Sequence, residues 1–207
     1  MSNELPRTSH RINRRSLLRN GLQAGIGVVM AGAASSLLTN TVWAESGAPA
    51  AHSVQTNWWW CFKCQGLFFG PDSGHVSASH CPAGGTHDLL ESSVYELWFS
   101  VSPPQIEPQP GWKWCAKCQG LFFGPDSGHV SASRCPAGGT HSTSGSSAYS
   151  VFFEDEKIGN QPGWKWCAKC QGLFFGPDSG HVSASRCPAG GTHTTSNSGK
   201  YALLFGS

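Results

Sequence analysis

Residues 109–141 read QPGWKWCAKCQGLFFGPDSGHVSASRCPAGGTH. Residues 161–193 repeat these 33 letters without a change, and residues 55–87 repeat them with five differences. Those differences are Thr56, Asn57, Trp59, Phe62 and His80. A sequence with a fixed period folds as a set of similar units. We therefore divide this part of the chain into three repeats, at residues 55–108, 109–160 and 161–207.

Each repeat carries three cysteines and a histidine at one spacing, which is Cys-x2-Cys, sixteen residues, Cys, five residues, His. Three thiolates and one imidazole complete a tetrahedral structural zinc site, and a Cys-x2-Cys turn presents two sulfurs to one ion. We predict one zinc ion in each repeat. The predicted ligands are Cys61, Cys64, Cys81 and His87; Cys115, Cys118, Cys135 and His141; and Cys167, Cys170, Cys187 and His193.

Two other uses of the cysteines compete with zinc. The first is disulfide bonding, which is common in proteins exported to an oxidising compartment, as the N-terminus of this chain suggests below. However, three cysteines cannot all pair within a repeat and nine cannot all pair within the chain. The string Trp114-Cys115-Ala116-Lys117-Cys118 looks like a thioredoxin active site, which needs a helix N-terminus to lower the pKa of its first cysteine. Gly120, Gly124 and Pro125 follow instead, so the spacing favours the metal.

A second histidine in each repeat offers an alternative fourth ligand. These residues are His75, His129 and His181, each within Asp-Ser-Gly-His. We favour the histidines after Cys-Pro-Ala-Gly-Gly-Thr, because paired glycines supply the left-handed backbone angles of a tight reversal and bring the chain back to the cysteines. The other three histidines are then polar residues beside a turn.

The N-terminal residues 1–44 resemble a bacterial Tat signal peptide. They contain Asn13-Arg14-Arg15-Ser16, an apolar stretch at 21–38, and Val42-Trp43-Ala44, which suits cleavage before Glu45. The resemblance implies export of a folded protein to the periplasm or beyond, with thiolate sites filled while the thiols are still reduced. A retained membrane anchor is the alternative; after cleavage we expect no permanent membrane span. Residues 45–54 are predicted to be a flexible lead-in.

The charge of the chain changes once this leader is set aside. The leader holds five of the 14 Lys and Arg residues and one of the 12 Asp and Glu residues, so 9 basic and 11 acidic residues remain, a formal charge of −2. A zinc ion with three thiolates would add −1 at each site. We therefore expect no nucleic-acid partner, because the basic surface that binds phosphates is missing.

The apolar residues fall into short runs bounded by Gly, Pro and Ser, which predicts an all-β fold. In the second repeat the runs are 112–115, 121–123, 129–133 and 149–153. Four short strands per repeat can close as one β-trefoil-like domain or as three zinc-ribbon-like beads joined by linkers. We favour the single domain, because three repeats that share one core bury more apolar surface than three beads of about 50 residues.

The tryptophans and one aspartate in each repeat are candidate ligand contacts. Exposed aromatic rings beside polar groups can stack on sugars, although burial in the core is the commoner use of Trp. The Gly-Pro-Asp-Ser-Gly stretches form turns first and ligand contacts second. The candidates are Trp58, Trp112 and Trp164, with Asp72, Asp126 and Asp178.

Residues 55–207 resemble a family of secreted bacterial proteins of mostly unassigned role. Their repeats share Trp-x-x-Cys-x-Lys-Cys-Gln-Gly-Leu-Phe, then Cys-Pro-Ala-Gly-Gly-x-His, then a strand with Tyr. The resemblance implies a secreted repeat module and no catalytic residues. We expect a monomeric binding protein for carbohydrate or a surface protein, not an enzyme. The alternatives are a metal-dependent hydrolase, if water replaced a histidine ligand, and a thiol redox or metal-buffering protein.

Overall fold

The computed structural model describes residues 53–99, 108–156 and 158–205. The predicted signal peptide and almost all of the lead-in lie outside these residues.

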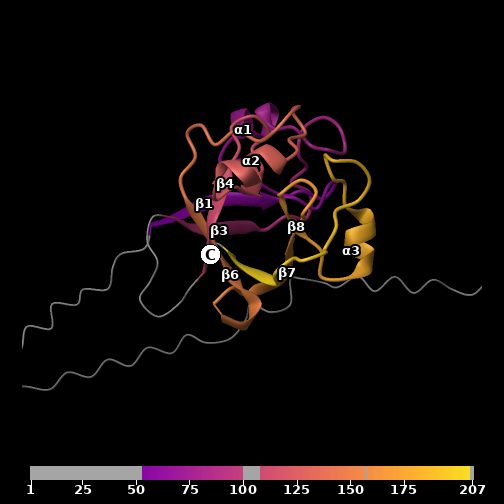
Figure 1. The fold of residues 1–207 in the computed structure, drawn as a ribbon. Coiled ribbons are helices and arrows are strands. Elements are labelled where there is room, and N and C mark those ends of the chain that lie inside the picture. The colour runs from indigo at the N-terminus through magenta and orange to yellow at the C-terminus, as the bar shows by residue number, and fades with distance from the viewer. Residues whose placement is uncertain (1–52, 100–107, 157, 206–207) are drawn as a thin grey trace, which may run out of the picture. The chain divides into compact units, whose positions relative to one another are not determined.

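Each repeat contributes three strands and one short helix (Figure 1). The first repeat has β1 (Ser53–Trp60), β2 (Leu67–Phe69), α1 (Ser73–Ala78) and β3 (Val94–Phe99). The second has β4 (Gln109–Trp114), β5 (Leu121–Phe123), α2 (Ser127–Ala132), β6 (Tyr149–Phe153) and the 3-10 turn η1 (Glu154–Glu156). The third has β7 (Gln161–Trp166), β8 (Leu173–Phe175), α3 (Ser179–Ala184) and β9 (Tyr201–Phe205).

The prediction of a fourth strand at 129–133 was wrong, because this segment belongs to helix α2. Asp126 precedes the helix, and its side chain accepts a hydrogen bond from the backbone N–H of His129 at 2.9 Å. Such a cap satisfies an amide that would otherwise lack a partner at the helix start. The helix ends where Ser133 N–H donates to the carbonyl of Val130. Six residues are too few to show a helical period in the sequence.

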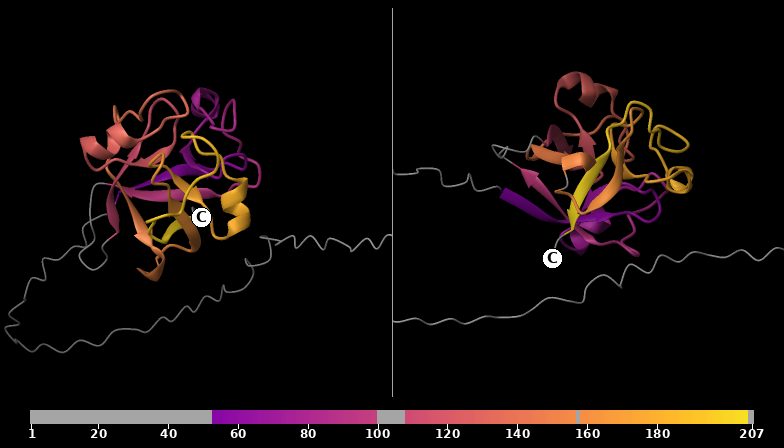
Figure 2. Two further views of the ribbon diagram at one scale, coloured as in Figure 1. Left: turned by 45° about the vertical axis from the view of Figure 1, so that its right-hand side comes forward. Right: turned by 90° about the horizontal axis from the view of Figure 1, so that it is seen from below.

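The strands form one nearly closed, barrel-like sheet with three-fold pseudosymmetry. In each repeat the first strand pairs antiparallel with both of the others, as β1 does with β2 and β3. The last strands of the repeats pair with one another in a cycle, β3 with β6, β6 with β9 and β9 with β3. Isolated bridges link the middle strands in the same cyclic order, Phe68 with Gly120, Phe122 with Gly172 and Phe174 with Gly66. In the left view of Figure 2 the three helices lie around the outside of the strands.

One aromatic core serves all three repeats. Trp58, Trp112 and Trp164 have no exposed surface. Each meets the tyrosine of another repeat edge to face, and Trp58 packs on Tyr149 with ring centroids 5.2 Å apart. The Tyr149 hydroxyl then donates to Gln55 Oε1 at 2.6 Å, again across the repeat boundary. Because each repeat completes its core with side chains of another, the three beads of the alternative prediction do not exist, and the single trefoil-like domain is confirmed.

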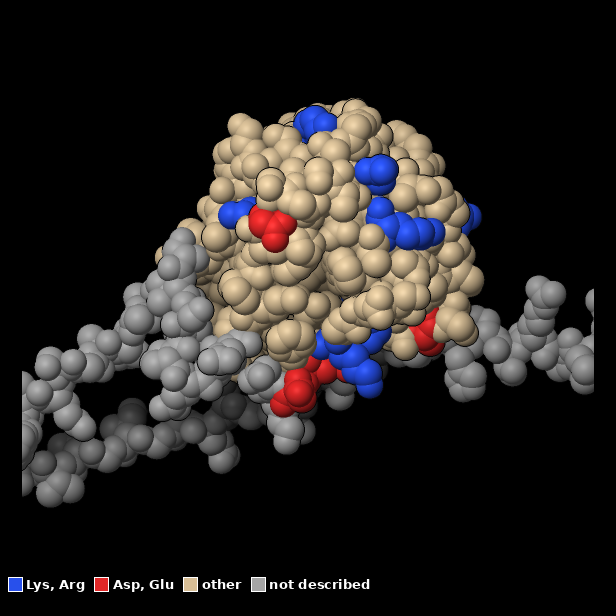
Figure 3. Space-filling view, in the orientation of Figure 1, with Lys and Arg blue, Asp and Glu red and all other residues tan. Residues whose placement is uncertain are grey.

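The surface of this unit is sparsely charged. On the face shown in Figure 3, Lys and Arg side chains are scattered among neutral residues and form no continuous basic patch. None of the helices in the described part of the chain has both the length and the apolar character that a membrane crossing requires.

Candidate metal centre

The first two cysteines of each site lie on a tight turn between two paired strands. In the first repeat the turn runs from Cys61, directly after β1, to Gly66 before β2. Cys61 N–H donates to the Gly66 carbonyl at 2.9 Å, and Gln65 N–H donates to the Cys61 carbonyl at 2.8 Å. Gln65 takes the left-handed conformation, with φ of 67°. These bonds fold the backbone so that Cys61 and Cys64 reach toward one point, as the Cys-x2-Cys spacing predicts.

The third cysteine and the histidine come from the glycine-containing reversal after the helix. Cys81 N–H donates to the Gly85 carbonyl at 2.8 Å, and Gly84 N–H donates back to the Cys81 carbonyl at 2.9 Å. Both glycines have positive φ, 96° and 66°, which side chains with a Cβ rarely adopt. Lys63 fastens the reversal to the cysteine turn, because its Nζ donates to the Gly84 carbonyl at 3.0 Å.

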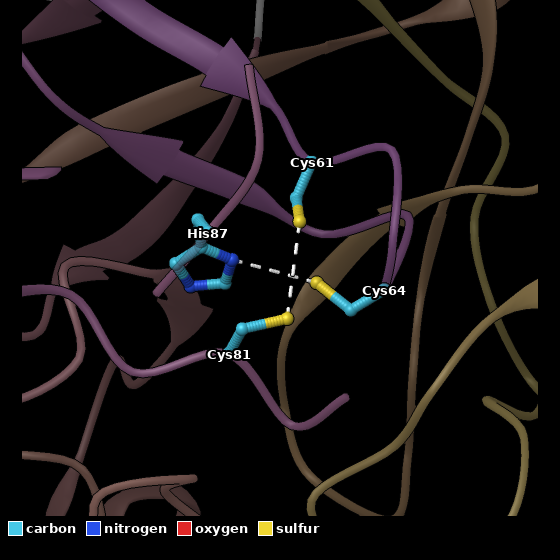
Figure 4. Close-up of side chains that lie close together, drawn as sticks. All are labelled: Cys61, Cys64, Cys81 and His87. Carbon is cyan, nitrogen blue, oxygen red and sulfur yellow. Dashed lines mark hydrogen bonds between the residues drawn. The ribbon is translucent and has the colours of Figure 1, made fainter. Parts of the chain in front are cut away.

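The four side chains converge on one point, as Figure 4 shows. Their ligand atoms all lie within 4.8 Å of one another, and all four residues are buried. The Cys61 and Cys81 sulfurs are 3.9 Å apart, and the Cys64 sulfur is 3.5 Å from His87 Nδ1. Zinc bonds of about 2.3 Å to sulfur and about 2.0 Å to nitrogen would place sulfurs about 3.8 Å apart and sulfur and nitrogen about 3.5 Å apart in a regular tetrahedron. The donor set therefore fits a zinc ion in both chemistry and size.

The other two repeats build the same cluster. The Cys115 and Cys135 sulfurs are 3.9 Å apart, and the Cys118 sulfur lies 3.5 Å from His141 Nδ1. In the third repeat the corresponding distances are 3.9 Å, from Cys167 to Cys187, and 3.4 Å, from Cys170 to His193. The structure thus brings together all twelve residues that the spacing selected, in three groups that could each hold a metal ion.

Disulfides do not account for these cysteines. All nine are free and buried. A disulfide requires two sulfurs about 2.05 Å apart, far closer than the sulfurs in the clusters.

Backbone amides around the cluster point at the sulfurs. Asp88 N–H approaches the Cys61 sulfur at 3.3 Å, Ala83 N–H approaches the Cys81 sulfur at 3.4 Å, and Gly66 N–H approaches the Cys64 sulfur at 3.5 Å. Hydrogen bonds of this kind stabilise negative charge on a thiolate, which is the form that binds a metal.

Without a cation the three thiols of a cluster cannot all ionise together. Side-chain hydrogen bonds from Cys64 and Cys81 lower the pKa of Cys61 far below its usual value. Burial raises the pKa of Cys64. The hydrogen bond between Cys81 and Cys61 raises the pKa of Cys81 to about 11. One thiolate therefore forms at the expense of the other two. A divalent ion held by these residues would supply the positive charge that allows all three thiols to lose their protons.

A buried serine holds the histidine of each cluster in position. Sequence patterns did not predict this role. Ser133 is fully buried at the end of α2. Its hydroxyl donates to the Val130 carbonyl at 2.6 Å and accepts a hydrogen bond from His141 N–H at 2.9 Å. Ser79 and Ser185 make the same pair of bonds in the other repeats. The repeats are identical over this stretch except at one position, so nothing in the sequence marks this serine among its neighbours.

Phenylalanine covers the imidazole of each cluster. Phe68 stacks on His87 with ring centroids 4.4 Å apart and an angle of 16° between the planes. Phe122 and Phe174 stack on His141 and His193 in the same way. The ring fixes the orientation of the imidazole and shields the site from water, which favours a closed structural site over an open catalytic one.

The cysteine turns also connect the repeats. The carbonyl of Cys118 accepts a hydrogen bond from His80 N–H at 3.4 Å, across the boundary between the first two repeats. Gln119 accepts one from Phe69 N–H through its carbonyl at 2.8 Å. The other two repeat boundaries have the equivalent bonds. All four ligands of each cluster thus belong to one repeat, and only the backbone of its cysteine turn bonds to a neighbouring repeat.

The alternative histidines lie away from the clusters. The side chain of His75 is partly exposed, and its Nδ1 lies 3.1 Å from Asp72 Oδ1. His129 and His181 make the same contact with Asp126 and Asp178. In each pair the backbone amide of the histidine donates to the aspartate and lowers the pKa of that carboxyl. These aspartates are helix caps, and a ligand contact by their exposed carboxylates stays a prediction.

The prediction that three tryptophans contact a ligand was wrong. Trp58, Trp112 and Trp164 were candidates for stacking on a ligand, but they are fully buried in the shared core. They lie there because each repeat presents its first strand to the inside of the barrel, where indole rings fill the space between repeats. A ligand cannot reach them in the folded protein.

Comparison with known proteins finds no matching family model, no similar curated protein and no similar solved structure. The metal-binding character of the repeats therefore rests on the geometry of this chain. That geometry defines a repeat protein with three buried sites, each with three sulfur donors and one nitrogen donor, around one core.

Proposed function

We propose that this chain is an exported, zinc-stabilised scaffold that binds a repetitive carbohydrate through surfaces displayed by its repeats. The observation that carries the proposal is the combination of three buried Cys3His clusters, each able to hold a metal ion, with a single shared core. Such an arrangement holds three similar outer faces in fixed relation to one another.

Zinc is the ion that this donor set favours. Soft thiolates together with imidazole in tetrahedral geometry select zinc, whereas calcium and magnesium prefer oxygen donors. All four donors are buried, and the spacing fits four-coordination without a solvent ligand. This supports a structural role for the ion, and it argues against the alternative of a hydrolase, which needs an open coordination position.

Burial of the thiols also argues against a redox or metal-buffering role. Cys61, Cys115 and Cys167 have no exposed surface, and their neighbours in each cluster are nearly as buried. Redox cysteines need access to a partner or oxidant. Thiolates that bind zinc in the reducing cytoplasm and cross the membrane in a folded chain would arrive protected, which suits the Tat-like leader.

Repetition of a weak site gives the proposed function its strength. When two sites on one rigid scaffold bind the same polymer, the second contact forms within the complex. A polymer with repeated units should therefore bind at least about 100-fold more tightly than its short fragment. We expect the monomeric protein to bind such a polymer, of the kind found on cell surfaces.

The test compares the purified, zinc-loaded chain on immobilised polysaccharides and on soluble oligosaccharides of the same composition. We expect binding to at least one polysaccharide class, and much weaker binding to its fragment. Retention on none of a broad panel of neutral and acidic polysaccharides would overturn the proposed function. Export is tested separately by fractionation of cells that produce the wild type or an Arg14→Lys, Arg15→Lys variant; only the wild type should leave the cytoplasm.

A further inference from the structure

The third repeat has an open groove beside its metal site. The groove has a volume of about 670 Å³ and lies between strand β7, helix α3 and the segment 192–200. Its walls carry two lysines, several hydroxyls and one carboxylate, from Lys165, Lys200, Ser183, Thr192, Thr195 and Asp178. Backbone from the Gly176-Pro177 turn forms part of the rim.

The charge of this groove is positive. The one carboxylate, Asp178, is already bonded through Oδ1 to the backbone N–H of His181 at 2.9 Å and to its ring Nδ1 at 3.0 Å. Among the described residues, the ion pairs are the three Asp–His contacts at the helix starts. Lys165 and Lys200 therefore bring two ammonium groups to the groove with no carboxylate of the described chain paired to either.

The first repeat has lost this groove chemistry. Trp59 stands where the third repeat has Lys165, Leu89 stands where it has Thr195, and Val94 stands where it has Lys200. The Trp59 indole packs against the metal cluster, and its Nε1 donates to the Gly70 carbonyl at 2.9 Å. The position that is cationic in the third repeat is thus covered by an aromatic ring in the first.

The second repeat is intermediate. It keeps Lys113 at the position of Lys165 and Thr143 at the position of Thr195, but Ala148 replaces Lys200. The number of lysines at these two positions is therefore two in the third repeat, one in the second and none in the first. The three repeats therefore form a natural series of variants at the positions that line the groove of the third.

We propose that the groove of the third repeat binds a saccharide unit that bears a carboxylate or a sulfate group. The two ammonium groups would pair with the oxyanion, and the hydroxyls of the walls would exchange hydrogen bonds with sugar hydroxyls. This inference rests on the proposed function, since it names the class of carbohydrate and the repeat that recognises it. It also makes the three faces unequal: the third repeat binds the anionic group, and the faces of the other two repeats add weaker contacts to the same polymer.

The test measures binding of the full zinc-loaded chain to alginate, dextran sulfate and neutral dextran. We expect binding to alginate or to dextran sulfate, no binding to dextran, and a decrease in affinity as salt is added. The variant Lys200→Ala, which installs the residue of the second repeat, should weaken binding about five- to tenfold, because it removes one charge-assisted contact. Lys165→Trp, which installs the residue of the first repeat, should remove the site.

Two further variants control for charge and for folding. Arg186→His gives the third repeat the residue His80 of the first, removes one positive charge outside the groove, and should leave the affinity within about twofold. Ala148→Lys gives the second repeat a second lysine and should add a second site. Zinc content and thermal unfolding of every variant show whether a loss of binding reflects a loss of fold.

The outcomes separate this inference from the proposed function. Binding to an acidic polysaccharide that is unchanged in Lys200→Ala and Lys165→Trp would overturn the groove assignment while the binding function stands. Equal binding to single-stranded DNA, or an equal loss in Arg186→His, would mean attraction to any polyanion and would also overturn it. Binding to neutral dextran alone would overturn the anionic class, and binding to no polysaccharide at all would overturn the proposed function itself.

Discussion

The shared core and the three metal clusters stabilise the molecule in different ways. The core joins strands of all three repeats, and its tryptophans contact tyrosines of neighbouring repeats. Each metal cluster instead gathers residues of one repeat, such as Cys115, Phe122 and Cys135, into a separate small group. We conclude that damage to the core spreads to all repeats, whereas damage to a cluster stays close to one site.

The substitution with the largest expected effect on stability is Trp112→Ala in the shared core. Deletion of a fully buried indole removes apolar contacts and leaves a cavity, at a cost of about 3–5 kcal/mol in the free energy of unfolding. Urea denaturation should show this loss, and metal release should begin at lower urea from all three sites together. The control is Trp59→Lys, which installs the residue of the other repeats outside the core and should cost far less. Metal release from the second site alone would contradict a shared core.

A cysteine substitution should damage one cluster only. Cys115→Ser removes one thiolate from the second site, so we expect two bound ions in place of three, with the other two sites filled. Hydrogen exchange should increase over residues 115–142 more than elsewhere. Native mass measurement gives the ion count. A variant that loses all three ions at once would show that the clusters, and not the core, hold the repeats together.

Removal of the buried serine hydroxyl should have a smaller effect at the same site. Ser133→Ala leaves the N–H of His141 without its acceptor, which costs about 1–3 kcal/mol. Loss of such a positioning contact should also weaken metal affinity at that site about 10- to 100-fold. The matched control is Ser131→Ala on the same helix, because that hydroxyl is exposed and bonds only to Gly128. Competition with a zinc chelator measures the affinity, and equal behaviour of the two variants would exclude a positioning role.

The smallest expected effect concerns the helix cap. Asp126→Ala removes the acceptor for His129 N–H and should increase hydrogen exchange in α2 alone. The fold lowers the pKa of this carboxyl below its ordinary value of 3.8. The contribution of the charge is therefore complete above that value and decreases as the pH falls through the lowered pKa. At about pH 6 the carboxylate is fully charged, so Asp126→Ala should show its full effect; hydrogen exchange in α2 that is the same in the variant and the wild type would contradict this assignment.

The metal ligands could be predicted from the sequence, while the helices could not. Cys-x2-Cys and the Gly138-Gly139 reversal are local signals, and their geometry is the same wherever they occur. The helix at Ser127–Ala132 depends on one carboxylate cap and on six residues without a buried side chain, so no periodic pattern announces it.

Burial of Trp112 and Ser133 depends on contacts that no single repeat contains or marks. Trp112 faces inward because Tyr201 of the next repeat packs against it. Ser133 accepts the N–H of a residue eight positions later, after a turn of the chain. Sequence patterns describe neighbours along the chain, so they could not distinguish an aromatic ring in a shared core from one that faces a ligand.

The claim that each repeat holds one zinc ion is tested most directly by the mass of the purified protein under native and denaturing conditions. Three closed sites predict a native mass with three additional zinc ions, which are lost on unfolding, and nine thiols that then react with an alkylating reagent. A metal-free native mass that is lower by two hydrogens for each disulfide would contradict the claim, because the cysteines would then hold the repeats together by covalent bonds.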